Sequence, residues 1–182
     1  MTAAHEHFRQ YGYEKTTVGN IAKAVGISTA YFYKFFDSKQ AIGNAICSLC
    51  LEEIERDVTS IIDLPVAAEA RIRRLFMALS AHAGRLSLRE SRFGELISYA
   101  WQERWQAVDE YEKTLANLIR LLVDQGRRTG EFEHKTTLDE TCRSILISLE
   151  PLRNPALWMQ RLGELDEQAN SLASLVLRSL AP

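Results

Sequence analysis

Residues 16–39, TTVGNIAKAVGISTAYFYKFFDSK, decide the fold of the first part of this chain. In the first half of the stretch, apolar residues recur three or four positions apart, which predicts one buried face of a short helix. These residues are Val18, Ile21, Ala22 and Val25. Thr16 or Thr17 can cap the start of this helix, and Gly26 stands at its end, where a left-handed backbone is favoured. The pattern therefore predicts a helix whose start and end are both set by local residues.

The second half of the stretch predicts another short helix after a very short turn between Val25 and Thr29. Ser28 can cap this helix, which we expect to run to Phe36. Two short helices joined by a glycine-containing turn form a helix-turn-helix, and the small side chain of Ala22 lets them approach closely. Such a helix can place its outer face against base edges in the major groove of DNA. The side chains expected on that face, to read bases, are Thr29, Ala30, Tyr31, Lys34 and Phe35.

Three other side chains are predicted to contact the DNA backbone. Thr17 and Tyr33 can donate to phosphate oxygens, and Lys39 lies in the first turn of the next helix, where an anion is favoured. Residues 1–50 carry five Lys or Arg and three Asp or Glu (net +2), whereas residues 51–182 carry seventeen and twenty-one (net −4). The net positive charge of residues 1–50 fits an anionic partner near the N-terminus. The alternative is a helical hairpin that only packs.

The rest of the chain predicts more helices. Glycine (9) and proline (4) are sparse among 182 residues, and apolar residues keep a helical spacing to the C-terminus. Helices are expected at about 2–11, 38–62 and 66–86, from 88, over 105–122, and at 137–152 and 162–180. Asp37 or Ser38 can cap the long helix, and Asp37 with Gln40 resembles a capping box. The sequence predicts an all-α protein whose domain boundary lies near Leu51, with domains at 1–50 and 51–182.

Several features argue against a membrane or secreted protein. No apolar run approaches the ~18–20 residues of a membrane span. The start, MTAAHEHFRQYGYEK, shows no secretion signal, so we expect a cytoplasmic protein with no membrane partner. Three cysteines, an odd number, argue against a disulfide framework. Cys47 and Cys50 form a C-x-x-C inside a helical pattern, which favours packing over a thiol sensor or a metal site.

Residues 8–42, FRQYGYEKTTVGNIAKAVGISTAYFYKFFDSKQAI, resemble the N-terminal domain of TetR-family transcriptional regulators. The matching positions are Phe8, Gly12, Tyr13, Thr16-Thr17-Val18, Ile21-Ala22, Val25-Gly26-Ile27-Ser28, Tyr33, Phe36 and Ser38-Lys39. The resemblance covers about residues 3–50, and the remainder matches in helical layout and length. It implies a homodimeric DNA-binding repressor with a three-helix head that reads an operator and a helical domain that binds a small molecule.

Three residues of the helix-turn-helix depart from the family pattern. Gly19 stands where a larger polar residue is common, and a glycine there weakens the helix by ~1 kcal/mol relative to alanine. Tyr31 and Phe35 make the reading face unusually aromatic. The operator sequence therefore does not follow from the resemblance.

The resemblance also implies a ligand pocket within about residues 51–160. Proteins bind small molecules in mostly apolar cavities that carry a few polar groups. The candidates of this kind are Phe76, His82, Phe93, Tyr99, Trp101, Trp105 and Asp109. For any single ring, a place in the core is the stronger interpretation. His82 is expected to be hydrogen-bonded rather than a metal ligand.

The last two predicted helices carry wide apolar stripes. Two such helices from each subunit can form a four-helix dimer interface under twofold symmetry. The candidates for this interface are Ile145, Leu149, Leu152, Leu172, Leu175 and Val176. The alternative is that each helix has a single stripe and uses it within its own subunit.

Catalysis finds little support in the sequence. There is no nucleophile elbow, P-loop, paired zinc spacing or glycine-rich phosphate loop. His5 and His7 stand two positions apart on a helix and point to different sides, so no metal and no cofactor are expected. The predicted function is a DNA-binding repressor released by a small molecule, and not an enzyme. The alternatives are a ligand-independent regulator, an activator, or a helical protein-interaction adaptor.

Overall fold

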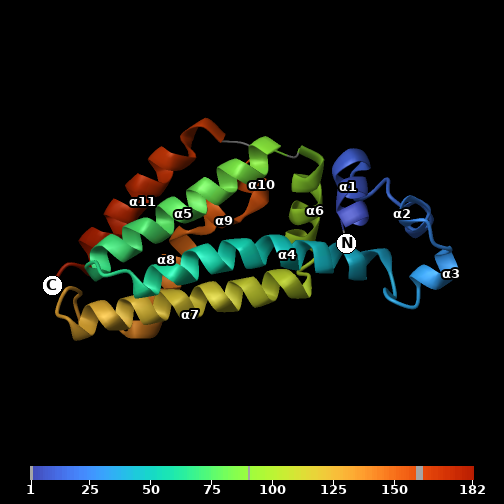
Figure 1. The fold of residues 1–182 in the computed structure, drawn as a ribbon. Coiled ribbons are helices and arrows are strands. Elements are labelled where there is room, and N and C mark those ends of the chain that lie inside the picture. The colour runs from blue at the N-terminus through green and yellow to red at the C-terminus, as the bar shows by residue number, and fades with distance from the viewer. Residues whose placement is uncertain (1, 90, 159–161) are drawn as a thin grey trace.

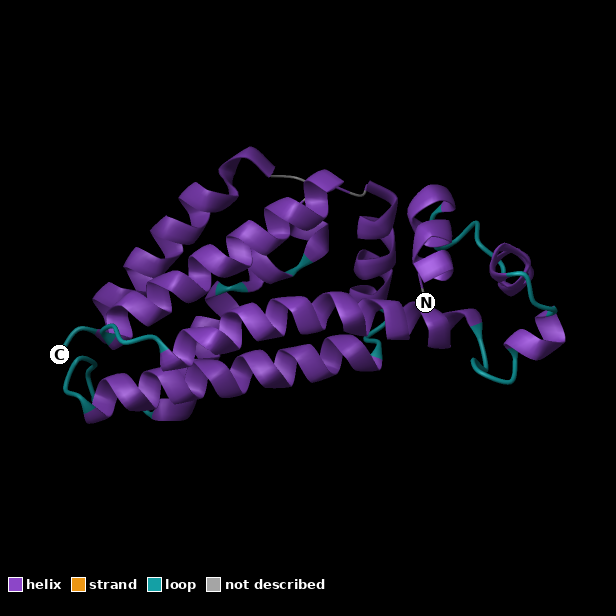
Figure 2. Cartoon of the chain, viewed as in Figure 1, coloured by secondary structure: helices purple, strands orange, loops and turns teal. Residues whose placement is uncertain are grey.

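The computed structural model describes residues 2–89, 91–158 and 162–182, with the side chains of 2, 88, 89, 91–93 and 162 left out of the description. The described residues form helices joined by turns, without a strand (Figure 1, Figure 2). The longer helices are α1 (Thr2–Tyr11), α2 (Val18–Val25), α4 (Lys39–Thr59), α5 (Ala68–Arg89), α6 (Ser91–Gln102), α7 (Gln106–Arg128), α8 (Leu138–Ser148) and α11 (Leu165–Leu180). The short ones are α3 (Thr29–Phe32), α9 (Glu150–Arg153), α10 (Pro155–Trp158) and the 3-10 turns η1 (Ser60–Asp63) and η2 (Leu162–Glu164). The all-α prediction is confirmed.

The helices form two parts, which we call the head and the body. The head comprises α1, α2, α3 and the first turns of α4, and lies at one end of the molecule (Figure 1). In the body, α4 runs beside α7, α5 packs against α11, and α8 packs against α7. The head meets the body in two ways: α4 passes from one into the other, and α1 packs against α6. No described helix combines the length and apolar character needed to cross a membrane.

Capping side chains set the limits of the two helices of the helix-turn-helix. Thr17 Oγ1 accepts a hydrogen bond from the Asn20 amide (3.2 Å), which starts α2. Gly26 ends it with φ of 77°, in the left-handed region, where a side chain would be strained. Ser28 Oγ accepts from the Tyr31 amide (3.1 Å) and starts α3. These predicted caps are confirmed.

The second helix of the motif is shorter than the sequence predicts. α3 ends at Phe32, and the Lys34 and Phe35 amides bond to carbonyls three residues back, at Tyr31 and Phe32. Such tighter turns carry the chain on towards α4. The side chain of Phe32 is buried and holds this segment to the head.

Two details of the predicted head are wrong. Ser38, rather than Asp37, caps α4, since its Oγ accepts from the Ala41 amide at 3.0 Å, so the proposed capping box at Asp37 does not form. Val25 is 48% exposed, because α3 does not cover the last residue of α2 before Gly26 turns the chain. The buried face of α2 is therefore limited to Ile21 and Ala22, with Val18 partly buried.

The helix predicted at 137–152 is broken into α8 and α9. Pro151 lies at the start of α9, where its missing N–H can be tolerated, but it cannot donate the bond that would continue α8. Downstream, Pro155 begins α10. The two prolines thus produce a pair of four-residue helices that close one side of the body.

Candidate DNA-binding surface and ligand cavity

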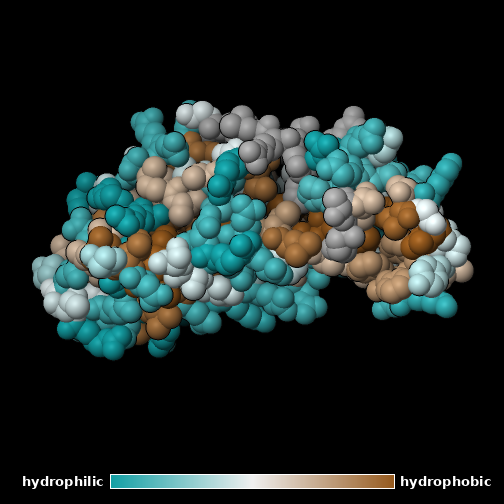
Figure 3. Space-filling view, viewed as in Figure 1, coloured by the Kyte–Doolittle hydropathy of each residue, from teal (hydrophilic) through white to brown (hydrophobic). Residues whose placement is uncertain are grey.

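All five side chains predicted to read bases are exposed: Thr29, Ala30, Tyr31, Lys34 and Phe35. The rings of Tyr31 and Phe35 meet edge to face with centroids 5.2 Å apart, and the Lys34 ammonium lies 5.5 Å from the Tyr31 ring centroid. Figure 3 shows hydrophobic residues at the surface of this end of the molecule, where α2 and α3 lie. We call these five residues the reading face.

The reading face combines apolar ring surface with a hydroxyl and a cation. Rings can contact thymine methyl groups, and a lysine can donate to guanine or to a phosphate. Phe35 is 62% exposed and Tyr31 47%, although water is an unfavourable environment for such rings. This chemistry suits a surface that a partner covers, and the contacts with individual bases remain a prediction.

The three residues predicted to contact the DNA backbone lie in different settings. The side chain of Tyr33 is half exposed beside the reading face. The Thr17 hydroxyl is engaged in the α2 cap, where it also donates to Asn20 Oδ1. The Lys39 ammonium donates to the backbone carbonyl of Tyr13 (3.1 Å) and lies 4.4 Å from the centroid of the Tyr13 ring. Thr17 and Lys39 therefore already make contacts within the head. Their predicted contacts with DNA would have to form in addition to these.

An aromatic cluster joins the head to the body. Tyr13, in the loop after α1, lies 5.0 Å from Tyr99 and 5.3 Å from Trp105, measured between ring centroids. Gly43 of α4 makes room for them, since a Cβ there would lie 2.7 Å from the Trp105 ring and 3.0 Å from Tyr13. Burial, and then the neighbouring Tyr99, raise the pKa of Tyr13 to about 12, so its phenol is neutral. Tyr99 and Trp105, which we predicted in a ligand pocket, both lie at this joint. Trp105 is buried there as core, whereas Tyr99 also lines the cleft beside the joint, so its role in a ligand pocket stays a prediction.

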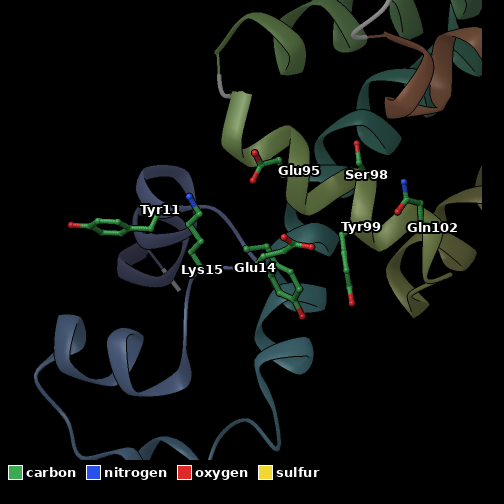
Figure 4. A pocket seen from close by; sticks show the side chains of 8 residues that line it. Tyr11, Glu14, Lys15, Glu95, Ser98, Tyr99 and Gln102 are labelled. Atoms are coloured by element: carbon green, nitrogen blue, oxygen red, sulfur yellow. The ribbon is translucent and has the colours of Figure 1, made fainter.

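A cleft of about 460 Å³ opens beside the joint, between the loop after α1 and the helix α6 (Figure 4). Its walls carry both signs of charge, from Glu14, Lys15 and Glu95. In Figure 4 the ring of Tyr11 points away from α6. The centroids of the Tyr11 and His7 rings lie 4.5 Å apart. The cleft thus combines charged groups with the rings of Tyr11, Tyr13 and Tyr99.

A second, much smaller cavity of about 10 Å³ lies inside the body, where α4, α5, α6, α7, α9 and α10 converge. Two of the predicted pocket residues line it, His82 and Trp101. The residues that the sequence analysis missed are Leu51, Ile54, Leu79, Ala83, Tyr111, Leu152, Arg153 and Trp158. The signal for Trp158 was available, as the third tryptophan of the chain directly after a proline break. We call this space the core cavity.

His82 forms a fixed polar wall of the core cavity. Its Nε2 lies 2.9 Å from Asp57 Oδ2, and its Nδ1 lies 2.7 Å from an Arg85 nitrogen. The neutral ring with its proton on Nε2 satisfies both contacts. Burial, and then the positive charge of Arg85, lower the pKa of His82, and the contact with Asp57 offsets only part of that. The prediction of a hydrogen-bonded histidine agrees with this geometry.

An ion-pair network lies behind the Arg153 side of the core cavity. Arg153 Nη1 donates to Glu112 and Nη2 pairs with Glu150. Glu112 also accepts from Arg104 Nη1 at 2.8 Å. Burial alone would raise the pKa of Glu112, but the hydrogen bonds from Arg153 and Arg104 lower it overall. The carboxylate is therefore ionised and shared between two arginines.

The remaining pocket candidates do not line the core cavity. Phe76 is fully buried in α5 and serves as core. Asp109 forms an ion pair with Arg104 at 2.6 Å. The side chain of Phe93 lies outside the described residues. The structure thus gives Phe76 a role in packing and Asp109 a role in an ion pair, and neither residue lines the core cavity.

Most of the predicted dimer residues are used within the subunit. Ile145, Leu149 and Leu152 are at most 2% exposed, and Val176 is 7% exposed. These four cannot reach a partner, so their assignment is wrong. Leu172 is partly buried, and Leu175 is 57% exposed. Four other exposed aliphatic side chains were missed by the sequence analysis: Leu49 on α4, Leu121 on α7, Ile147 on α8 and Leu157 on α10.

The cysteines of the C-x-x-C sequence lie on α4 and form no disulfide. Burial, and then the neighbouring Cys50, raise the pKa of Cys47 to about 12, so the reactive thiolate is suppressed. This environment supports the interpretation of Cys47 as a packing residue.

A short exposed helix on a helix-turn-helix, joined to a helical body, defines the class of DNA-binding regulators. Residues 1–46 match the model of the bacterial regulatory proteins of the tetR family, and residues 68–172 match that of the tetracyclin repressor-like C-terminal domain. The chain belongs to the TetR family of transcriptional regulators.

Individual relatives are distant. The uncharacterized HTH-type transcriptional regulator YhgD of Bacillus subtilis (strain 168) is 20% identical over 130 residues, which cover 71% of this chain and 68% of that protein. A transcriptional regulator from Cytophaga hutchinsonii superposes with a TM-score of 0.75 at 19% identity, over 100% of this chain and 96% of that one. Bacillus subtilis FadR in complex with stearoyl-CoA superposes with a TM-score of 0.71 at 19% identity, over 98% of this chain and 96% of that one. Thermus thermophilus FadR in complex with lauroyl-CoA superposes with a TM-score of 0.68 at 20% identity, over 100% of this chain and 93% of that one. At these identities the structures show a shared fold.

Proposed function

We propose that this protein is a homodimeric repressor that binds an operator through its reading face and releases it when a small molecule enters the body. The observation that carries the proposal is the exposure of Tyr31, Lys34 and Phe35 on the second helix of a helix-turn-helix and the turn that follows it. The family is one of DNA-binding regulators rather than enzymes. Since its target is chromosomal DNA, the proposal places the protein in the cytoplasm.

The core cavity supports the ligand-binding part of the proposal. It lies where six helices meet, and one of them, α4, continues into the head. The two FadR structures hold acyl-CoA, so acyl thioesters are the first effectors to test on this chain. A ligand releases DNA only if it binds more tightly to the state in which the heads are wrongly placed.

Exposed aliphatic side chains support the homodimer. Ile147 and Leu175 are the most exposed large aliphatic residues described, and they lie on α8 and α11. In a dimer the two heads would enter successive major grooves, about 34–36 Å apart. The substitution Ile147→Glu should therefore give a monomer in sedimentation, whereas the control Leu49→Glu, at a similarly exposed position on α4, should remain dimeric. Dimers in both variants would rule out this interface.

Binding to DNA tests the central part of the proposal. Fragments selected from a random pool identify the preferred site, and fluorescence anisotropy then measures affinity. We expect Tyr31→Ala and Lys34→Ala to change the preferred sequence, because each contributes to the reading face. Tyr33→Ala should weaken binding to all sequences alike, as loss of a phosphate contact does.

Lysines provide a second measurement with a matched control. Lys39→Ala should weaken binding and reduce the slope of log affinity against log salt by about one unit. Lys113→Ala, exposed on α7 of the body, should change neither. A chain that selects no DNA would favour a protein-interaction adaptor. DNA binding that no acyl thioester or other small molecule alters would favour a ligand-independent regulator.

A further inference from the structure

Two residues that line the core cavity carry a buried N–H donor without a hydrogen-bond partner among the described residues. The donors are Trp158 Nε1 and Arg153 Nε. Trp158 is 5% exposed, and the side chain of Arg153 is 10% exposed. Buried donors are nearly always paired in proteins, because an unpaired donor has lost its hydrogen bonds to water without replacement. Unlike the other unpaired donors, these two belong to residues that line one cavity, so an acceptor atom bound there could satisfy them.

The charges around Arg153 decide which acceptor fits. Both terminal nitrogens of its guanidinium are already paired, with Glu112 and Glu150. A ligand carboxylate would lie close to these two negative charges, and like charges at short range repel strongly in a buried place. A neutral carbonyl oxygen accepts the same two hydrogen bonds without that repulsion. The surroundings thus favour a carbonyl over a carboxylate.

The other walls of the cavity define the rest of the ligand. Aliphatic side chains from α4, α5 and α9 face it, together with the rings of Trp101 and Tyr111. The polar atoms of His82 are occupied by Asp57 and Arg85. At about 10 Å³ the space holds no more than about one water molecule, so its walls must separate to admit a ligand. The part of the ligand beyond its acceptor is therefore apolar.

We propose that the effector is a neutral, largely apolar molecule with a carbonyl group, such as an ester or thioester, whose oxygen accepts hydrogen bonds from Trp158 Nε1 and Arg153 Nε. This inference rests on the proposed function, because it names the ligand class of the same cavity. It adds the polar group that the ligand must carry and the two residues that recognise it.

Matched small molecules and a conservative substitution test the inference. The probes are methyl hexanoate, methyl octanoate and methyl phenylacetate, each compared by calorimetry with its parent carboxylate and with a hydrocarbon of similar size. We expect at least one ester to bind the full-length protein more tightly than both of its counterparts. Trp158→Phe removes the indole N–H and keeps an aromatic ring, and should weaken ester binding about tenfold, with no effect on the hydrocarbon.

Trp105→Phe is the matched control. The Trp105 indole N–H is also buried without a partner among the described residues, but it lies at the joint and not beside the core cavity. This variant should bind esters within about twofold of the unchanged protein, as expected for a site remote from the ligand. The inference is overturned if no ester binds better than its acid and hydrocarbon, or if the two tryptophan variants weaken binding equally.

The same samples separate this inference from the proposed function. DNA binding is measured with and without the ester that binds most tightly. If the ester depends on Trp158 but leaves the DNA complex intact, the ligand class stands and release by a ligand fails. If the protein binds DNA and shows no preference for esters, the regulator stands and the ligand class fails.

Discussion

The head and the body differ in whether they leave large aromatic rings exposed. In the head, Tyr11, Tyr31, Tyr33 and Phe35 are between 45% and 62% exposed. In the body, the large rings are at most 9% exposed at Phe76, Trp101, Trp105, Tyr111, Phe132 and Trp158. Among the described residues, the large hydrophobic side chains exposed on the body are aliphatic. Aromatic rings therefore pack in the core of both parts, as Phe8 and Phe32 do in the head, and among the described residues they form an exposed surface on the head alone.

The sharpest test of this comparison uses two phenylalanines of the head that lie three residues apart. Phe32 is 3% exposed and Phe35 is 62% exposed. Phe32→Ala should reduce the free energy of unfolding by about 3–5 kcal/mol, because it leaves a cavity in a small core. Phe35→Ala should change it by less than about 0.5 kcal/mol while weakening DNA binding. Urea unfolding and fluorescence anisotropy measure the two effects.

Equal losses of stability from the two substitutions would contradict the assignment of Phe35 to a contact surface. So would a Phe35→Ala variant that binds the selected DNA as tightly as the unchanged protein.

A second test addresses the joint, where rings of the head and the body meet. In Gly43→Ala the new methyl group would collide with Trp105 and Tyr13, so we expect a loss of about 1–3 kcal/mol in the free energy of unfolding. The matched control is Gly84→Ala on α5, which has open space around the new methyl group and should gain about 0.5–1 kcal/mol. A Gly43→Ala variant as stable as its control would show that the joint is loosely packed.

A third test concerns the polar side chain that the body buries among its rings. The folded-state pKa of His82 lies below its usual 6.5, so the unfolded chain binds more protons in acid. Stability should therefore fall as the pH drops below about 6.5, with a slope of at most about 1.4 kcal/mol per pH unit from this residue. His82→Gln should flatten the curve of unfolding free energy between about pH 7.5 and about pH 5.5.

Two ion-paired carboxylates lose their contribution to stability at lower pH than this window. The pKa values of Glu112 and Asp139 are lowered by their arginine partners, so the stability that they contribute is lost only as the pH falls below their ordinary values of 4.5 and 3.8. Unchanged pH dependence in His82→Gln would mean that the pKa of His82 is the same in the folded and unfolded protein.

The smallest expected effect concerns α2. A methyl group at Gly19 would contact Thr17 Oγ1 at 3.8 Å and Thr29 Oγ1 at 3.9 Å, which are ordinary distances. Gly19→Ala should therefore stabilise the head by up to about 1 kcal/mol through helix propensity. Thermal unfolding measures this gain. A loss of stability would show that the crossing of α2 and α3 needs the glycine.

Local chemistry explains what could be predicted from the sequence. The limits of α2 and the start of α3 depend on Thr17, Gly26 and Ser28, and each acts through bonds within a few residues. The exposure of the reading face also follows from helical spacing once Phe32 is placed inside. These features need no knowledge of the remainder of the fold.

Features that depend on distant segments could not be predicted in the same way. Trp105 is seen to belong to the joint only when α4 is placed beside it with Gly43 at the contact. The buried side of α8 follows from its packing on α7, which hides Ile145 and leaves Ile147 exposed. Arg153 and Trp158 lie on four-residue helices next to prolines. Helices this short have too few turns for the spacing of apolar residues to predict which side chains are buried.

One consequence follows from the continuity of α4. Its 21 residues form a rod of about 30 Å without a flexible linker between the body and the head. A tilt of about 10° at one end would displace the other by about 5 Å, which exceeds the spacing of about 3.4 Å between successive base pairs. Small angular changes inside the body are therefore sufficient to shift the head out of step with the double helix.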